Sequence, residues 1–317
     1  MIKTSSKRKR RCFTHMFRIA NTVIKLYSYD PDEPTPRKHA WVLKNFLYTG
    51  AMRPHITLTV QCRRAPYILR RSQRLFFSSN PHVNGVSWSL YREKAHYIIA
   101  CHARAHDQIA CINRSFTNGT VYLAESQQTW NPAYIIYNIL QVVLLNYLSF
   151  HSGIFIHAAG ALTPDGTAVL FAGPPESGKS TIARMLHKDG NLKVINDDRV
   201  IVRRNGRHFM AYASPWHSSY NLYLKHREPP RQLERVFFIR RSKKNAIQPM
   251  DRQNTFRRIW SNLFISFWDK DIAARQIAVC YQLLSEASFY RLGLRRGRSA
   301  IEFIKSICVH TASAITE

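Results

Sequence analysis

An eight-residue segment limits the possible folds of this 317-residue chain most strongly. It reads Gly173-Pro174-Pro175-Glu176-Ser177-Gly178-Lys179-Ser180 and fits the phosphate-binding loop pattern G-x-x-x-x-G-K-[ST] at every specified position. A continuous apolar run over 168–172 precedes it, which is typical of a strand buried on both faces. Residues 182–188 are predicted to form a short helix that ends near Gly190, and 192–195 the next strand. This order of elements predicts an α/β nucleotide-binding core.

The chemistry of such a loop gives most of its residues a role. The glycines let the backbone curl so that N–H groups point at phosphate oxygens, and the following helix adds its positive N-terminal end. Lys179 would neutralise the β- and γ-phosphates, and the Ser180 hydroxyl would hold Mg²⁺. A structural loop that binds nothing is the alternative. The predicted ligands are ATP and Mg²⁺, and the predicted cofactor-binding residues are Gly173, Ser177, Gly178, Lys179, Ser180 and Thr181.

Two adjacent acids and one histidine flank this core in the sequence. Asp197 and Asp198 directly follow the second strand, where one carboxylate could bind Mg²⁺ through water while the other accepts a proton from a hydroxyl. The alternative is a solvated turn. His157 lies in the apolar segment 154–162, before the loop strand, and a lone histidine in such a segment is most often a core residue.

The composition is that of a folded and strongly basic protein. Lys and Arg total 47 against 19 Asp and Glu, a net charge of +28, and 45% of residues are hydrophobic. Such a chain is neither disordered nor of low complexity. The six cysteines are scattered, and the one cluster, Cys101-His102 with His106 and Cys111, has a spacing that fits no common metal site. No secretory signal follows the basic head, so we expect a cytoplasmic protein with reduced thiols.

We expect three parts along the chain. Residues 1–12 form a basic tail, which is either solvated or a contact for an acidic partner. Residues 13–130 form a β-rich N-terminal domain, because short alternating segments such as 56–60, 88–91 and 96–100 are separated by turns. Residues 131–317 form the P-loop domain. Its later elements are predicted as a strand at 236–239 and helices around 256–268 and 272–284.

One uncharged stretch, 126–164, imitates a membrane span. The polar residues Asn138, Gln141 and Asn146 interrupt it on different sides, whereas a spanning helix needs about 20 predominantly apolar residues. We therefore expect no membrane span but a helix, opened by Pro132, that is buried in a globular core.

Taken together, His157, the loop and Asn196-Asp197-Asp198 resemble the catalytic domain of the HPr serine kinase/phosphorylase family. That family shares its nucleotide-binding architecture with phosphoenolpyruvate carboxykinase. The resemblance covers roughly residues 150–240, and 211–216 also looks like the Gly-Thr-Pro-Trp stretch of the short HPr-kinase-like proteins of peptide-modification gene clusters. The fold class implied is α/β, a P-loop core of this type with a β-rich N-terminal domain.

The resemblance also implies roles for single residues. Asp197 matches the general base that deprotonates the substrate serine, and His157 matches the histidine near that carboxylate. Lys179 matches the phosphate-binding lysine, Ser180 the Mg²⁺ residue, and Asp198 is left as a second metal residue.

Two features depart from the family's pattern. No Asp or Glu occurs between Asp198 and Glu228, where the family supplies a glutamate to the metal. The arginine-containing motif linked to phosphorolysis has only Arg240 and Arg241 as candidates. These departures put the reverse reaction, and HPr itself as substrate, in doubt.

The expected function is therefore an ATP-dependent kinase that phosphorylates a hydroxyl, with serine expected, on a peptide or small protein. An acidic acceptor would suit the charge of +28. The alternative is a nucleotide-gated binding module with weak ATPase activity. Nucleic acid is not the expected partner, because no readout motif accompanies the charge. A homo-oligomer stays open, since long relatives are hexameric.

Overall fold

The computed structural model describes residues 13–28, 43–63, 73–80, 86–93, 95–102, 108–123, 135–218, 229–295 and 297–309. The predicted basic tail, 1–12, lies outside these residues. Within them the protein is mixed α/β, with two sheets and five α-helices. The chain divides into two compact units, unit 1 (Met1–Val143) and unit 2 (Leu144–Glu317), where the sequence predicted a boundary at 130/131.

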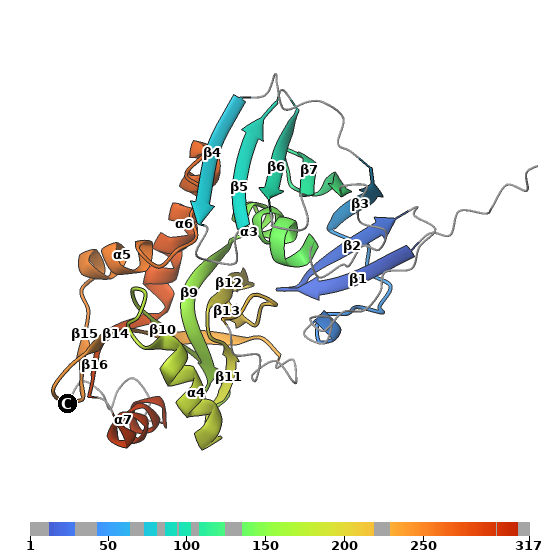
Figure 1. Cartoon of the computed structure of the whole chain (residues 1–317). Helices are drawn as coiled ribbons and strands as arrows, with labels where there is room; N and C mark the ends of the chain where they lie inside the picture. The colour runs from blue at the N-terminus through green and yellow to red at the C-terminus, as the bar shows by residue number, and fades with distance from the viewer. Residues whose placement is uncertain are drawn as a thin grey trace, which may run out of the picture. The chain divides into compact units, whose positions relative to one another are not determined.

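Unit 1 is built on one sheet, whose strands run from blue to green in Figure 1. The strands are β1 (Phe13–Ile19), β2 (Thr22–Ser28), β3 (Ile56–Cys62), β4 (Gln73–Asn80), β5 (Val86–Arg92), β6 (His96–His102), β7 (Gln108–Asn113) and β8 (Asn118–Leu123). They pair in the order β1-β2-β3-β8-β7-β6-β5-β4. β3 is parallel to β2 and to β8, and the other neighbours are antiparallel. The three segments predicted as strands lie in β3, β5 and β6.

The sheet of unit 1 has one buried face. Along β3 and β7, buried residues alternate with half-buried ones, as the period of two in a strand requires. Leu58 and Ala110 belong to the buried set, and Thr59 and Cys111 to the other. The turn from β7 to β8 is organised by Asn113, whose Oδ1 accepts the backbone N–H of Thr117 at 2.9 Å.

The predicted apolar helix is present but begins irregularly. A π-helical turn, η2 (Ile136–Leu140), runs directly into α3 (Gln141–Ser149). Most of its apolar residues are buried, and the side chain of Asn146 is buried with them. Among the described residues, no helix has both the length and the apolar character needed to cross a membrane.

Unit 2 is built on the second sheet and on the helices around it. The strands are β9 (Gly153–Leu162), β10 (Ala168–Ala172), β11 (Lys193–Asn196), β12 (Arg199–Asn205), β13 (His208–Tyr212), β14 (Arg231–Arg241), β15 (Ala246–Pro249) and β16 (Ser288–Leu294). The helices are α4 (Lys179–Asp189), α5 (Arg252–Trp260), α6 (Lys270–Glu286) and α7 (Arg298–Val309).

The strands pair in the order β10-β9-β12-β13-β14-β16-β15, with β11 on β9. β10 also pairs with β14, so the pairings of β10, β9, β12, β13 and β14 close a ring. β14 is parallel to both β10 and β16. Parallel strands need crossover connections, and α4 follows β10 for this reason. It packs against β9 and β11 (Figure 1).

Both faces of this sheet are covered by apolar side chains. Leu170 of β10 packs in one cluster with residues of α5 and α6, such as Ile259 and Leu283. Its neighbour Phe171 packs in another cluster, with residues of α4 and α7 such as Ile304. Successive residues of a strand point to opposite faces, so a strand covered on both faces is apolar at every position. The unbroken apolar run over 168–172 is such a strand, as the sequence predicted.

Two of the expected elements end differently in the structure. The helix expected around 256–268 ends at Trp260, because residues 262–264 instead join β9: Leu263 bridges Ile156, and the N–H of Phe264 donates to the Phe155 carbonyl at 3.1 Å. The strand expected at 236–239 is longer, at 231–241. The strands β12, β13, β15 and β16 and the helix α7 were not predicted.

Candidate functional site

The loop between β10 and α4 lies where the sequence predicted it. Lys179 is the first residue of α4 and only 6% exposed, and its Nζ donates to the carbonyls of Gly173 at 2.7 Å and Pro174 at 2.9 Å. Gly178 precedes the helix with φ of +108° and has no side chain with which to cap it. The first-turn N–H groups of α4 therefore have no side-chain cap, which leaves them for an anionic ligand.

Two of the loop's residues have unusual surroundings or backbone geometry. A Cβ at Gly173 would lie 2.8 Å from the Ser177 Oγ and 3.0 Å from Ile239 of β14, so a larger residue there would require both side chains to shift. Glu176 has a φ of +62°, which is uncommon for a residue with a side chain. Its carbonyl accepts a hydrogen bond from the Arg241 guanidinium at 3.2 Å, which links the loop to the end of β14.

Strand pairing brings His157 beside this loop. Ala158 of β9 pairs with Ala172 at the end of β10, so His157 is level with the first residue of the loop. On its other side, His157 pairs with Arg199 at the start of β12. Asp198 precedes that residue, and its Oδ1 lies 3.3 Å from the Nε2 of His157. These side chains are 33% and 21% exposed, so solvent and a substrate can reach both.

The charges of these groups affect one another. Burial lowers the pKa of His157, as does the positive charge of Lys179, while Asp198 opposes the shift. Burial also lowers the pKa of Lys179, again opposed by Asp198. His157 is therefore mostly neutral at pH 7, and its imidazole can donate a hydrogen bond to the carboxylate or accept a proton.

Asp197 points elsewhere. It is 1% exposed, and its Oδ1 accepts the backbone N–H of Ser218 at 3.0 Å while the Ser218 hydroxyl donates to its Oδ2. Burial raises its pKa, and the hydrogen bonds from Ser218 oppose that shift. The sequence placed His157 near Asp197, whereas in the structure the Nε2 of His157 lies next to the carboxylate of Asp198.

Asn196 holds the turn from which Asp197 and Asp198 point to different partners. Its Oδ1 accepts the backbone N–H groups of Asp198 at 2.8 Å and Arg199 at 2.9 Å, which turns the chain from β11 into β12. Its Nδ2 donates to the carbonyls of Ser214 at 3.0 Å and Trp216 at 3.1 Å. The segment that resembled Gly-Thr-Pro-Trp thus holds the turn that carries both carboxylates.

Asn262 is a residue of the site that sequence reasoning missed. Its Oδ1 accepts the N–H of Gly173 at 3.0 Å, and its backbone carbonyl accepts the N–H of His157 at 2.7 Å. Its Nδ2 donates to the Arg258 carbonyl at 2.7 Å, at the end of α5. One buried asparagine therefore ties the loop, the histidine strand and a helix together. The only signal was its low helix propensity inside an expected helix.

The ring of Phe264 closes the site beside the histidine. It lies 6.1 Å from the ring of His157, between centroids, and the guanidinium of Arg199 lies 5.2 Å above it. The guanidinium over the ring is at a distance typical of a cation–π contact, so Arg199 and Phe264 support each other beside the His157–Asp198 pair.

The remaining predicted residues lie around the start of α4. Ser180 is half-buried and Thr181 exposed in its first turn. No group of three His, Cys, Asp or Glu side chains in the described part of the chain could hold a metal ion. Mg²⁺ usually takes one or two protein ligands together with substrate phosphates, so Ser180 fits an ion that arrives with a nucleotide.

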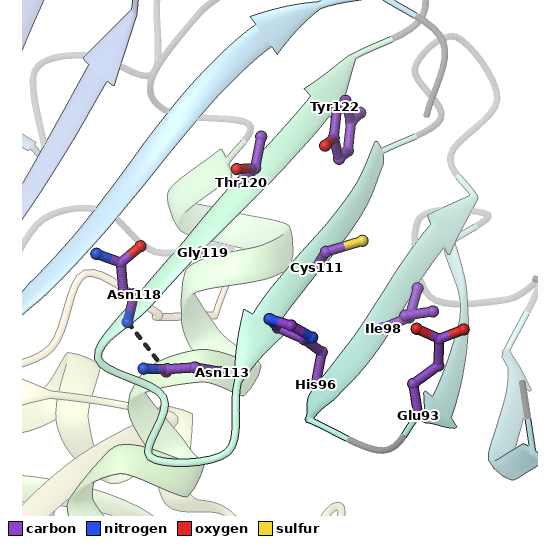
Figure 2. A pocket seen from close by; sticks show the side chains of 9 residues that line it. All are labelled: Glu93, His96, Ile98, Cys111, Asn113, Asn118, Gly119, Thr120 and Tyr122. Atoms are coloured by element: carbon purple, nitrogen blue, oxygen red, sulfur yellow. Dashed lines mark hydrogen bonds between the residues drawn. The ribbon is translucent and has the colours of Figure 1, made fainter. Parts of the chain in front are cut away.

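A pocket of about 340 Å³ adjoins the loop on the side of β14. It is lined by loop residues from Pro174 to Ser177 and by the arginines Arg240, Arg241 and Arg258. A larger cavity of about 440 Å³ lies on β6, β7 and β8 of unit 1 (Figure 2).

The cavity in unit 1 has little reactive character. Its thiol, Cys111, has a pKa raised by burial and by the nearby carboxylate of Glu93. A thiol with a raised pKa is a poor nucleophile and a poor metal ligand at pH 7. Asn113 lines the cavity but its side chain is engaged in the turn to β8, as Figure 2 shows.

Comparison with known proteins adds little. No family model matches the sequence, and no curated protein is similar to it. Among solved structures, the HPr(Ser) kinase/phosphatase from Coxiella burnetii shares 9% identity, over 48% of this chain and 92% of that chain, with a TM-score of 0.30. It is a weak structural neighbour, and at that TM-score it carries no argument here.

Proposed function

We propose that this protein is an ATP-dependent kinase that phosphorylates a serine hydroxyl on a peptide or small protein. The observation that carries the proposal is the His157–Asp198 pair, at 3.3 Å, level with the first residue of a phosphate-binding loop. Binding a nucleotide requires the loop alone, whereas deprotonating a hydroxyl requires a positioned base within reach of it.

The loop would bind the phosphates of ATP. The uncapped N–H groups of α4 and the Lys179 ammonium would face the β- and γ-phosphates, once that ammonium exchanges its two carbonyl partners for phosphate oxygens. Ser180 would hold Mg²⁺ together with those oxygens, and the ion would neutralise part of their charge.

We assign the base to Asp198, where the sequence predicted Asp197 as base and Asp198 as a metal residue. Asp198 is partly exposed and paired with His157, while Asp197 is buried and already accepts two hydrogen bonds from Ser218. The proton of the acceptor serine would pass to Asp198 while the serine oxygen attacks the γ-phosphorus of ATP. The bond from the γ-phosphorus to ADP would break, and ADP would leave. His157 would hold the carboxylate in place, and Asp197 would position the segment that carries Ser218.

One observation favours a second function, a nucleotide-gated binding module with weak ATPase activity. The chain has no Asp or Glu between Asp198 and Glu228, so a further carboxylate for the metal is missing from that segment. A module of this kind would bind ATP and Mg²⁺ but transfer phosphate only slowly, and to water.

Labelled ATP separates the two functions. The protein would be incubated with γ-labelled ATP, Mg²⁺ and heat-treated lysate of the source cell, and labelled phosphoserine would be measured after acid hydrolysis. The kinase reading predicts phosphoserine that depends on Lys179. ATP binding with label released only as free phosphate would favour the binding module, and no ATP binding would contradict both.

A further inference from the structure

We propose that Arg240, Arg241 and Arg258 form a second anion-binding subsite, which binds an acidic group of the acceptor. The inference rests on the proposed kinase function and adds a substrate class to it: an acceptor whose reacting serine lies a fixed distance from a carboxylate or phosphate.

The subsite lies at the ends of two parallel strands. Ala172 of β10 pairs with Phe238 of β14, so the loop begins level with Ile239 and the two arginines of β14 follow next to it. Crevices beyond the carboxyl ends of adjacent parallel strands are where ligands bind in α/β proteins. Arg258 of α5 completes the pocket from a third element.

The lining of the pocket is cationic. Three exposed arginines and one acidic residue, Glu176, line it, and the Arg241 guanidinium donates a hydrogen bond to the Glu176 carbonyl. The Ser177 Oγ is buried at its rim with no hydrogen-bond partner in the described part of the chain. Guanidinium groups match carboxylate and phosphate oxygens in charge and in geometry.

This subsite adjoins the place proposed for ATP phosphates. Of the six residues predicted to bind the nucleotide, Ser177 lines the pocket, whereas Gly173 and Gly178–Thr181 do not. A second anion, not carried by the phosphate chain of the donor, therefore suits it best.

Sheet geometry gives the spacing that the acceptor needs. His157 is on β9 and Arg240 is on β14, and β10 lies between these two strands. Two strand spacings of about 4.8 Å each therefore separate His157 from Arg240 across the sheet. An extended peptide advances about 3.3 Å per residue, so an acidic residue about three positions from the serine would reach the arginines.

The test uses two fluorescein-labelled synthetic peptides, each with one serine, in the presence of Mg²⁺ and a non-hydrolysable ATP analogue. One has Glu three residues from the serine on both sides, and the other has Gln there. The variant is Arg240→Gln with Arg258→Gln, and the matched control is Arg257→Gln, an exposed arginine of the same helix that does not line the pocket. Peptide affinity is read by fluorescence anisotropy and ATP affinity by a fluorescent nucleotide.

The proposal predicts that the Glu peptide binds the wild type more tightly than the Gln peptide does. The double variant should lose about tenfold or more of that affinity, and the control less than about twofold. ATP affinity should hold in both. Equal binding of the two peptides, an equal loss in the control, or a loss of ATP affinity with peptide affinity unchanged would overturn it. Because ATP binding is read separately, failure of the proposed function is distinguishable from failure of the subsite.

Discussion

The two sheets of this protein place their polar side chains differently. In unit 1 the sheet has one buried face and one half-buried face, so polar residues such as Thr59 and Thr120 lie along the strands themselves. In unit 2 apolar clusters cover both faces of the sheet, and the charged residues of the site lie where β9, β10 and β14 end or meet. The comparison teaches that covering both faces restricts chemistry to the strand ends, where side chains from several elements meet.

The cavities of the two units also differ in where they lie and in the side chains that line them. The larger one, in unit 1, lies on a sheet face and includes a thiol with a raised pKa. The smaller one, in unit 2, adjoins the loop and gathers three arginines.

The largest expected effect comes from the loop of unit 2. Lys179→Ala should lower ATP turnover by about 10²–10³-fold, the range for loss of one hydrogen-bond donor to the charge that develops in a transition state. The fold should persist, because burial already lowers the pKa of this lysine and disfavours its charge. Turnover and thermal melting measure the two effects, with the exposed Lys188→Ala of the same helix as control. Full turnover in Lys179→Ala would remove the nucleotide site from this loop.

Core truncations in the two units should separate stability from nucleotide binding. Leu170→Ala in unit 2 and Leu58→Ala in unit 1, both fully buried, should each cost about 2–5 kcal/mol of the free energy of unfolding. Below the melting transition, only Leu170→Ala should weaken ATP binding, because Leu170 lies on the strand that leads into the loop. Denaturant titration and nucleotide titration measure these effects. An equal loss of ATP affinity in Leu58→Ala would break the division between the units.

Asp197 should make unit 2 less stable as the pH rises. Its pKa is raised in the folded state, so between the unfolded value of about 3.9 and the folded value the native state holds the extra proton, and stability falls with rising pH. Asp197→Asn should therefore raise the melting temperature at pH 7, and the gain should vanish below about pH 4. Melting scans across this range measure it, and a variant that is less stable at pH 7 would mean that the bonds from Ser218 outweigh burial.

The smallest effect should come from the outer face of unit 1. Thr120→Val should change the free energy of unfolding by less than about 0.5 kcal/mol, as surface substitutions do. The reverse exchange in the covered sheet, Val169→Thr, buries a hydroxyl and should cost about 1–3 kcal/mol. Chemical denaturation measures the free energy of unfolding of both variants. Equal losses in the two variants would contradict the difference between the two sheets.

The sequence predicted the local parts of this fold. The strand at 168–172 and the helix after the loop were predicted because hydrophobic pattern and glycine placement act over a few residues. Asn262 could not be predicted, because its bond to Gly173 joins residues 89 positions apart. The prediction of a helix around 256–268 was wrong in its second half for the same reason, because Leu263 pairs with Ile156 of the distant strand β9.

The two adjacent acids show the same limit within the site. Asp197 and Asp198 are neighbours in sequence, and nothing in their residue types says which one meets the histidine. The pairing of Arg199 with His157, together with the turn that Asn196 organises, decides it in favour of Asp198. This pairing joins strands that are about 40 residues apart in the sequence, so the local residue types of the two acids do not reveal it.

The most direct test of the account compares Asp198→Asn with Asp197→Asn in the transfer of label from γ-labelled ATP to phosphoserine. Asp198→Asn should slow transfer by about 10²–10⁴-fold, the share of a general base, with ATP affinity within about twofold of the wild type. Asp197→Asn should retain most of the wild-type rate, because the hydrogen bonds that its carboxylate accepts within the described residues come from Ser218 and not from His157. A slow Asp197→Asn beside a nearly normal Asp198→Asn would contradict the assignment of the site to the His157–Asp198 pair.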